Sequence, residues 1–306
     1  MYEYDKRVVL TLDAGGTNFV FSAIQGNNEM ISPIGLPAVS DNLDECLEVL
    51  VKGFDRVIAA IPVPPVAISF AFPGPADYEN GIIGDLPNFP SFRGGVALGP
   101  FLKHKYGIPV FIENDGNLFA YGEALSGALP MINRELSLAG CSREYKNLIG
   151  ITLGTGFGAG VVINKVLLTG DNGCGGDIWL MRNKKYPDML AEESVSIRAV
   201  RRVYSDLSGQ SSASLSPKDI YDIAEGIKEG DSHAAIASFN ELGIMAGAAI
   251  ASVLNVVDGL VVIGGGVAGA SKYILPALIT ELRAQLTTFS GNKFPCVSMQ
   301  VYNGED

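Results

Sequence analysis

The sequence is poor in basic residues and in long apolar runs. Its 306 residues include 22 Lys and Arg against 33 Asp and Glu, so the net charge at pH 7 is −11, and no basic cluster occurs. Because DNA phosphates and anionic lipids attract basic patches, this balance argues against nucleic acid and membrane surfaces as partners. The longest apolar run, residues 243–257, is shorter than the roughly 20 residues that cross a bilayer, so no membrane span is expected.

Cysteine and histidine are scarce as well. Four cysteines are scattered along the chain without a C-x-x-C pair: Cys46, Cys141, Cys174 and Cys296. Isolated thiols are typical of a reduced protein rather than of a disulfide framework. The N-terminal residues MYEYDKR lead directly into an apolar strand pattern, so we expect no signal peptide and predict a cytoplasmic protein.

Glycine, by contrast, is abundant, and it marks a pattern that occurs twice. Residues 8–18 read VVLTLDAGGTN, and residues 148–160 read LIGITLGTGFGAG. Each is an apolar run that breaks into glycines beside a threonine, which predicts a strand ending in a turn with exposed N–H groups. Such turns can hold phosphate oxygens. Two copies about 140 residues apart predict two similar halves that grip one polyphosphate from opposite sides.

The second turn excludes two common nucleotide sites. It lacks the G-K-S/T of a Walker A loop, and it leads into another strand at 160–163 rather than into the helix of a Rossmann fold. A third glycine run, residues 264–266, follows an apolar strand. Without side chains it lets a flat ring or a ribose approach the backbone, although an ordinary strand–helix turn is the alternative.

Acidic residues follow two of the predicted strands. Asp13 precedes the first turn and is well placed to hold Mg²⁺ through water, or else to cap a hairpin turn. Asp115 follows a strand at 109–114 and precedes a helix, where α/β proteins bind ligands. A carboxylate there can take a proton from an attacking hydroxyl; the alternative role is a helix N-cap.

Hydrophobic periodicity predicts an α/β chain with no Gly/Ser linker. The predicted strands are 8–13, 19–24 and 30–36, which form a meander, then 66–72, 109–114, 148–153, 159–163, 166–170, 259–263 and 297–302. The predicted helices are 41–59 with Asp41 as N-cap, then 98–106, 116–126, 191–206, 217–229, 232–255 and 272–288. Residues 73–100 are mostly loop, and 129–147 form a polar surface segment. The helices at 116–126 and 232–255 have small-residue faces that either cross at a hinge or pack tightly.

Together these segments resemble the ROK family of sugar kinases and sugar-responsive repressors, within the sugar kinase, actin and Hsp70 superfamily. The matching segments occur in order over about residues 7–290: LDAGGTN, Pro73-Gly74-Pro75, LPNFP at 86–90, VFIENDGNLFAYGEA at 110–124, LGTGFGAG and VVIGGGVA. The resemblance implies the α/β, duplicated actin-like ATPase (ribonuclease H-like) fold, with two lobes around a central cleft. We expect one lobe over 1–115, joined by about 290–306, and the other over 116–289.

The resemblance implies an ATP- and Mg²⁺-dependent, glucokinase-like transfer of a phosphoryl group to a hydroxyl of a hexose or N-acetylhexosamine. Asp115 would be the general base, and Asn88, Asn114 and Asp115 would hold sugar hydroxyls. Asp13 would hold Mg²⁺ through water. The expected ATP site consists of Asp13, Gly15, Gly16, Thr17, Asn18, Gly154, Thr155, Gly156, Gly264, Gly265 and Gly266. Only seven residues precede the first strand, which favours the kinases over the repressors, and a homodimer stays open because no interface pattern stands out.

One segment departs from the family pattern. Where many members have G-E-I-G-H-M and a zinc-binding cysteine cluster, this chain has GDIWLM at 176–181 and no cysteine over 182–192, so we predict no zinc. Asp177 and Glu192 are the expected sugar-side carboxylates, and Trp179 is expected in the core rather than on a sugar face. The departures leave two alternatives open: a catalytically weak sugar- or nucleotide-binding sensor, and an actin- or Hsp70-like ATPase that acts on protein partners.

Overall fold

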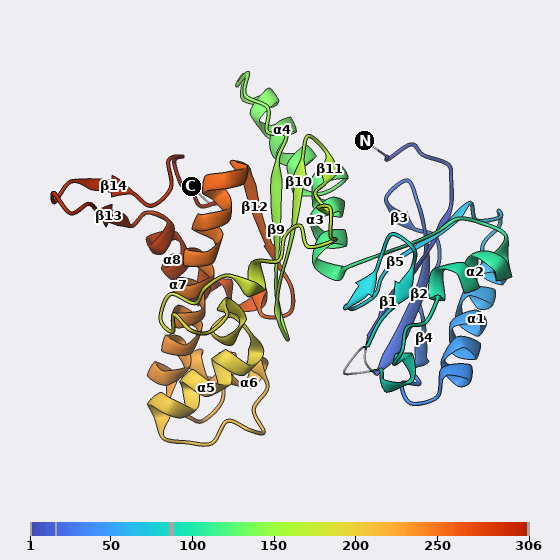
Figure 1. Cartoon of the computed structure of the whole chain (residues 1–306), viewed down its shortest axis with the longest axis horizontal. Helices are drawn as coiled ribbons and strands as arrows, with labels where there is room; N and C mark the ends of the chain where they lie inside the picture. The colour runs from blue at the N-terminus through green and yellow to red at the C-terminus, as the bar shows by residue number, and fades with distance from the viewer. Residues whose placement is uncertain (1, 16, 86–88, 305–306) are drawn as a thin grey trace. The chain divides into compact units, whose positions relative to one another are not determined.

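The computed structural model describes residues 2–15, 17–85 and 89–304, and these form two compact units (Figure 1). Unit 1 comprises Met1–Leu118, Leu125–Pro130 and Asp171–Gly173. Unit 2 comprises Phe119–Ala124, Met131–Gly170 and Cys174–Asp306. Each unit has its own sheet and its own hydrophobic core. The limits of the two lobes in the sequence stay a proposal.

Unit 1 is built on a six-stranded sheet with the order β3-β2-β1-β5-β8, in which β4 also pairs with β2. Strand β1 pairs with β2 antiparallel and with β5 parallel, and β5 pairs with β8 parallel. The parallel strands therefore end at one edge of the sheet. The bounds are β1 Val9–Ala14, β2 Asn18–Gln25, β3 Asn28–Glu29, β4 Ile34–Pro37, β5 Ala67–Ala71, β6 Ala76–Asp77, β7 Ile82–Ile83 and β8 Val110–Glu113, with helices α1 Leu43–Ala60, α2 Leu98–Tyr106 and the 3₁₀ turn Pro90–Phe92.

The core of unit 1 is aromatic. Helix α1 packs its apolar face on the sheet, where the ring of Phe54 meets the ring of Phe21 edge-on with 5.1 Å between centroids. A Cβ on Gly53 would lie 2.3 Å from the Phe21 ring, so this glycine sets the distance of the helix from the sheet. The predicted Asp41 cap is wrong, because Asn42 accepts the Glu45 N–H at 3.3 Å. Burial raises the pKa of the Cys46 thiol to about 11, as suits an inert core cysteine.

Unit 2 repeats the central pattern of unit 1. Its sheet has the order β11-β10-β9-β12, with β9 antiparallel to β10 and parallel to β12, as β1 is to β2 and β5. This likeness supports the duplication predicted from the two glycine turns. The strands are β9 Leu148–Leu153, β10 Phe157–Ile163, β11 Val166–Leu167 and β12 Leu260–Gly264. The helices that follow β8 are α3 Asp115–Leu125, α4 Ala128–Leu138, α5 Ile197–Ser208, α6 Pro217–Ala224, α7 Ser232–Val257 and α8 Ser271–Leu282.

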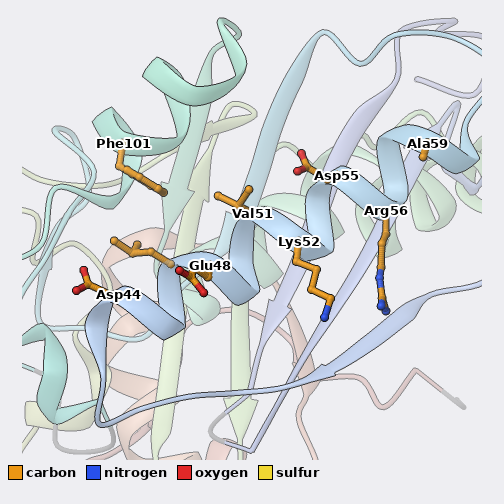
Figure 2. A pocket seen from close by; sticks show the side chains of 9 residues that line it. Asp44, Glu48, Val51, Lys52, Asp55, Arg56, Ala59 and Phe101 are labelled. Atoms are coloured by element: carbon orange, nitrogen blue, oxygen red, sulfur yellow. The ribbon is translucent and has the colours of Figure 1, made fainter.

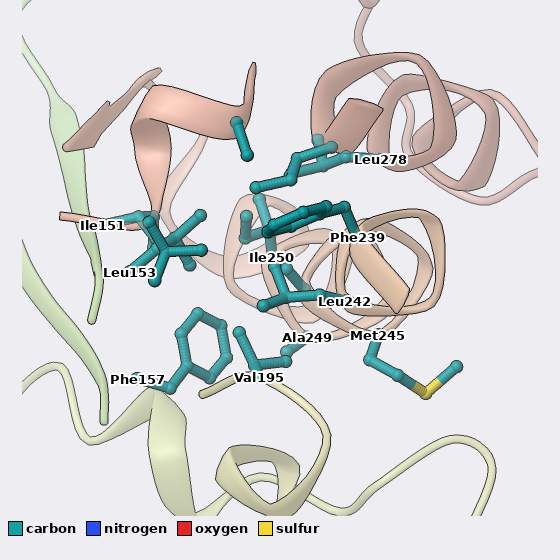
Figure 3. Packing of buried hydrophobic residues seen from close by; sticks show 14 of the residues in the cluster. Ile151, Leu153, Phe157, Val195, Phe239, Leu242, Met245, Ala249, Ile250 and Leu278 are labelled. Atoms are coloured by element: carbon teal, nitrogen blue, oxygen red, sulfur yellow. The ribbon is translucent and has the colours of Figure 1, made fainter. Parts of the chain in front are cut away.

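Helix α7 is the central helix of unit 2. By length and composition it could cross a membrane, but a core helix passes the same test, and more than half of its apolar stretch is buried. Figure 3 shows Phe239, Leu242 and Ile250 of α7 facing Leu153 of β9 and Leu278 of α8 within one cluster of buried side chains. The packing of α7 is therefore that of a core helix.

The small-residue faces of α3 and α7 each pack tightly against another element: α3 packs against β9, and α7 packs against α8. A Cβ on Gly243 of α7 would lie 2.4 Å from the Ile274 carbonyl oxygen of α8. A Cβ on Gly150 of β9 would lie 2.6 Å from Ala120 of α3. The close approach of α7 to α8 and of β9 to α3 shows tight packing at both faces. A crossing of the two helices at a hinge stays an untested alternative.

The predicted polar surface segment 129–147 begins with a helix, α4, in which only Leu129 is buried. The bounds of other predicted elements differ from the structure. The predicted strand at 297–302 is wrong, because these residues join no strand among the described residues. A hairpin precedes them instead, since α8 ends at Leu282 and β13 Gln285–Thr287 pairs with β14 Lys293–Pro295. The predicted helix at 191–206 begins only at Ile197, where Ser196 caps it.

Gly243→Ala tests the contact between α7 and α8. Alanine has the higher helix propensity, but its methyl group would overlap the Ile274 carbonyl, so we expect a loss of about 1–3 kcal/mol in the unfolding free energy. The matched control is Gly122→Ala in α3, where the added Cβ meets nothing within 4 Å and should stabilise by up to about 1 kcal/mol. Urea denaturation measures both, and equal effects of the two substitutions would contradict the packing argument.

Candidate functional site

The first glycine turn joins β1 to β2 at the end of the unit 1 sheet. Asp13 pairs with Val20 in the antiparallel register, so the chain reverses within a few residues. A Cβ on Gly15 would lie 2.9 Å from the Asn18 carbonyl oxygen, which leaves room only for glycine. Asp13, Thr17 and Asn18 are exposed at this turn. Gly16, predicted to bind phosphate, lies outside the described residues.

Parallel pairing brings a second set of predicted residues to the same edge. Asp13 of β1 is in register with Ala71 of β5, and Ala71 is in register with Glu113 of β8. Neighbouring strands lie about 4.8 Å apart, so the backbones at Asp13 and Glu113 are about 10 Å apart. Asn114 and Asp115 follow Glu113 directly. The predicted phosphate turn and the predicted sugar residues therefore share one edge of the unit 1 sheet.

The start of α3 leaves Asp115 free of the capping role. The side-chain oxygen of Asn114 accepts the N–H groups of Gly116 at 2.9 Å and Asn117 at 3.4 Å, as an N-cap does. Asp115, the first residue of the helix, also accepts the Gly116 N–H at 2.9 Å through one carboxylate oxygen, and its side chain is exposed. A carboxylate with an unengaged oxygen is what proton abstraction requires.

Two further side chains at this edge were not predicted from the sequence. Glu113 accepts the Asn114 N–H at 2.9 Å and the Asn117 side-chain amide at 3.1 Å. Asn117 is 6% exposed, and its side-chain oxygen has no partner among the described residues. The sequence already held the clue, because both residues belong to the segment ENDGN that carries Asp115.

Tyr78 braces the same edge from the loop after β5. Its hydroxyl donates to the Phe72 carbonyl at 2.9 Å. The pKa of Tyr78 is raised to about 12. Burial is the largest cause, the charges of Asp115 and Glu113 add to the rise, and a hydrogen bond with Asn114 opposes it. Tyr78 therefore stays neutral and holds the loop close to Asn114. Asn88, predicted in this loop as a sugar ligand, lies outside the described residues.

The second glycine turn, in unit 2, is held by a carboxylate. Glu192 accepts the Phe157 N–H at 3.0 Å with one oxygen, and the Arg198 guanidinium lies 3.3 Å from the other. A Cβ on Gly156 would lie 2.5 Å from the Glu192 carboxylate, so a side chain at this position would displace that carboxylate. The Ile197 N–H donates to the Gly154 carbonyl at 3.0 Å. Glu192, predicted on the sugar side, thus also anchors the predicted phosphate turn.

The third glycine turn lies next to the second one. Gly264 of β12 is in register with Thr152 of β9, and the Val267 N–H donates to the Leu153 carbonyl at 2.9 Å. Gly265 has φ +91°, and a Cβ there would lie 2.4 Å from that carbonyl oxygen. A cavity of about 260 Å³ adjoins the turn. It is lined by Pro217, Lys218, Tyr221, Phe239, Gly266, Val267, Gly269 and Ala270.

This cavity suits a flat aromatic ring, because two aromatic side chains and a glycine backbone line it. Tyr221 and Lys218 were not predicted from the sequence, since α6 lies far from the glycine turn along the chain. Only the fold brings α6 beside residues 264–266. Unit 2 thus groups the turn at 154–156, Glu192 and the turn at 264–266 at one end of its sheet.

Asp177 and Trp179 lie on the loop that follows β11. The Trp179 indole N–H donates to Asp177 at 3.1 Å, and Trp179 is 37% exposed. The predicted core position of Trp179 is wrong, because the 3₁₀ turn Ile178–Leu180 buries Ile178 and directs its neighbour outward. Among the described residues, no group of three or more His, Cys, Asp and Glu side chains could hold a metal ion, and the absence of zinc stays a prediction.

Comparison with known proteins identifies close similarity to sugar kinases. Residues 9–302 match the model of the ROK family. A glucokinase of known structure from Parabacteroides distasonis is 66% identical, with a TM-score of 0.85 over 92% of this chain and 79% of that chain. A glucokinase from Thermotoga maritima is 26% identical over 89% of this chain and 86% of that protein. An N-acetyl-D-glucosamine kinase from Vibrio cholerae is 29% identical over 56% of this chain and 51% of that protein.

Tyr78→Phe tests the brace beside Asn114. The folded chain raises the Tyr78 pKa from about 10 to about 12, so between these pH values the unfolded chain loses the proton first and stability falls as pH rises. At pH 8 the unfolding free energy of the variant should be about 1 kcal/mol lower than that of the wild type, because the variant lacks the hydrogen bond to Phe72. Above pH 10 the unfolding free energy of the variant should fall less steeply with pH than that of the wild type. Tyr4→Phe, at an 87% exposed side chain, is the control. Urea denaturation from pH 8 to 12 measures both, and parallel curves for Tyr78→Phe and the wild type would contradict the argument.

Proposed function

The chain belongs to the ROK family, and we propose that it transfers the γ-phosphoryl group of ATP to a hydroxyl of a hexose or N-acetylhexosamine, with Asp115 as general base. Two relatives that span most of the chain, from Thermotoga maritima and Parabacteroides distasonis, are glucokinases, and the chain is a sugar kinase with the duplicated actin-like ATPase fold of its family. One observation supports Asp115 as the general base most directly, namely the shared edge of the unit 1 sheet. Asp13 lies in β1, and Asp115 follows β8, which is two strands away from β1 in the same sheet.

On the acceptor side, Asp115 would take the proton of the attacking sugar hydroxyl. Its exposed carboxylate supports this role, because Asn114 provides the side-chain cap of α3. Asn88 and Asn114 would bind further hydroxyls through amide groups, which both donate and accept hydrogen bonds. Asp177 and Glu192 are the proposed sugar ligands of unit 2. In phosphoryl transfer such positioning supplies much of the rate, together with charge stabilisation.

On the nucleotide side, the two glycine turns would hold the phosphates. The proposed groups are the backbone N–H groups of Gly15, Gly16, Asn18, Thr155 and Gly156, with the hydroxyls of Thr17 and Thr155. Gly154 would shape the turn, because its N–H donates to the Gly156 carbonyl at 3.1 Å. The adenine ring would enter the cavity beside Gly264, Gly265 and Gly266, against Tyr221. Asp13 would hold Mg²⁺ through water, and the ion, when bound, would neutralise phosphate charge.

The N-acetyl-D-glucosamine kinase of Vibrio cholerae supports the N-acetylhexosamine option, and the glucokinases support the hexose option. We propose a cytoplasmic enzyme whose partners are small molecules, with neither a nucleic acid nor a membrane among them. The acidic composition, with a net charge of −11, supports that choice.

Asp115→Asn tests the general base. The amide cannot accept the proton, so kcat should fall by about 10²- to 10⁴-fold while KM for the sugar changes little. Stability should hold, because Asn114 caps α3. An ADP-release assay over glucose, fructose, mannose, allose, N-acetylglucosamine and N-acetylmannosamine measures the rates, with Asp41→Asn as control. Full activity of Asp115→Asn would exclude it as base. Sugar binding by the wild type in calorimetry without turnover would favour the sensor.

Substitutions at Glu192 test how the second turn is held. Glu192→Ala removes the acceptor of the Phe157 N–H, so KM for ATP should rise about tenfold. Glu192→Gln keeps an oxygen acceptor, so its KM for ATP should stay within about threefold of the wild-type value. Glu193→Ala is the matched control, because Glu193 also contacts Arg198 but has no contact with the turn. If Glu192→Ala raised only KM for the sugar, Glu192 would be a sugar ligand without a role at the turn.

A further inference from the structure

Asn183 is the buried residue of an otherwise exposed loop in unit 2. Its exposed fraction is 2%, whereas every other residue of the loop 182–190, which the structure describes throughout, is exposed or half-buried. Even Met189, an apolar residue, is 53% exposed. Burying a polar side chain costs free energy unless its hydrogen bonds are made, so the burial of Asn183 requires a complete set of partners.

The Asn183 amide has that complete set. Its oxygen accepts the backbone N–H groups of Lys185 and Tyr186, each at 3.0 Å. Its nitrogen donates to the Leu190 carbonyl at 3.3 Å and to the Ser194 hydroxyl at 2.8 Å. An asparagine side chain has two donor hydrogens and an oxygen with two lone pairs, so its full capacity is used. The amide thereby ties the first half of the loop to its end.

Backbone pairing closes the same loop at its base. The Ala191 N–H donates to the Met181 carbonyl at 2.7 Å, and Arg182 and Leu190 form an antiparallel bridge. The two ends of the loop therefore lie side by side, and the Asn183 amide fills the space that they enclose with hydrogen bonds rather than with apolar packing.

The closed loop joins the two turns that carry the proposed sugar ligands of unit 2. The 3₁₀ turn Ile178–Leu180 follows Asp177 and leads into the loop, and the 3₁₀ turn Ala191–Glu193, which contains Glu192, leads out of it. The two turns pack against each other. The distance between the two carboxylates therefore depends on how firmly the loop is closed.

Exposed ion pairs also attach the loop to the helices behind it. Lys184 lies 2.5 Å from Glu281 of α8, and Lys185 lies 2.7 Å from Glu241 of α7. Both lysine side chains are nearly half exposed, and ion pairs in contact with water contribute little to stability. The buried amide is therefore the stronger of the two attachments.

The groove beside α1 in unit 1 lacks such a buried polar group. Its volume is about 770 Å³, and Figure 2 shows Asp44, Glu48, Lys52 and Arg56 along it. These four side chains are exposed, and no buried residue lines the groove. Water solvates such charges well, so the groove contains nothing comparable to Asn183.

We propose that Asn183 is a positioning residue for the sugar side of the site, and that it fixes the spacing of Asp177 and Glu192 by closing the loop 182–190. This role rests on the proposed function, in which both carboxylates bind the sugar. Glu192 also anchors the turn at 154–156, so a loosened loop weakens the binding of ATP as well. Asp115 belongs to unit 1 and keeps its geometry.

Asn183→Ala tests the proposal, because it removes all four side-chain hydrogen bonds. KM should rise about tenfold for the sugar and about threefold for ATP, with kcat within about threefold of the wild-type value. A variant that is only less stable has a smaller folded fraction, which lowers kcat and leaves both KM values unchanged. Ser194→Ala removes one of the four bonds and should raise KM for the sugar about threefold. The ADP-release assay measures these constants.

Two variants serve as controls. Lys185→Ala removes an exposed ion pair from the same loop but keeps the backbone N–H that Asn183 binds, so KM for the sugar should stay within about twofold. Gly243→Ala weakens the packing of α7 on α8 and should leave KM for the sugar unchanged. An unchanged KM for the sugar in both Asn183→Ala and Ser194→Ala, with an active wild type, would overturn the proposal.

Trp179 reports on the loop without any substrate, because it is the one tryptophan of the chain and its indole donates to Asp177. Quenching of its fluorescence by acrylamide should increase about twofold in Asn183→Ala and stay at the wild-type level in Lys185→Ala. If the wild type phosphorylates no sugar, the proposed function fails, and the quenching then decides whether Asn183 holds the Asp177 turn. Equal quenching in the wild type and in Asn183→Ala would overturn that role.

Discussion

Parallel strand pairing is the constraint on which the candidate site depends. Strands β1, β5 and β8 run the same way, so Asp13, Ala71 and Glu113 stand in one row across the sheet. The residues that follow these strands must then lie at the same edge, although about 100 residues of chain separate them. Strands β9 and β12 obey the same rule in unit 2 and bring the turns at 154–156 and 264–266 together.

Close backbone approach is the second constraint, and it explains where glycine is needed. A Cβ on Gly265 would overlap the Leu153 carbonyl, and a Cβ on Gly156 would displace the Glu192 carboxylate. A carboxylate beside this turn would by itself repel the phosphate proposed to bind there. Arg198 contacts the same carboxylate and offsets its charge. The turn is thereby held in shape by a group that the proposed sugar chemistry also uses.

The hydrogen bonds at the start of α3 give three neighbouring residues different roles. Glu113 binds the backbone and Asn117, Asn114 caps the helix, and Asp115 keeps an exposed carboxylate. Helix ends leave N–H groups that need acceptors, and a residue that serves as cap cannot also serve freely as base. The division therefore matters for any reaction at Asp115.

Local patterns in the sequence determined the elements and the chemistry within them. Alternating apolar residues predicted most strands, and glycine runs predicted the three turns, because these features depend on neighbours along the chain. Only the tertiary structure decided the features that depend on distant contacts. Trp179 faces outward because Ile178 beside it packs into the core of unit 2. Tyr78 reaches Asn114 from the loop after β5, and α6 supplies Tyr221 to the cavity beside Gly266. Such contacts form between segments far apart in sequence, and no local period encodes them.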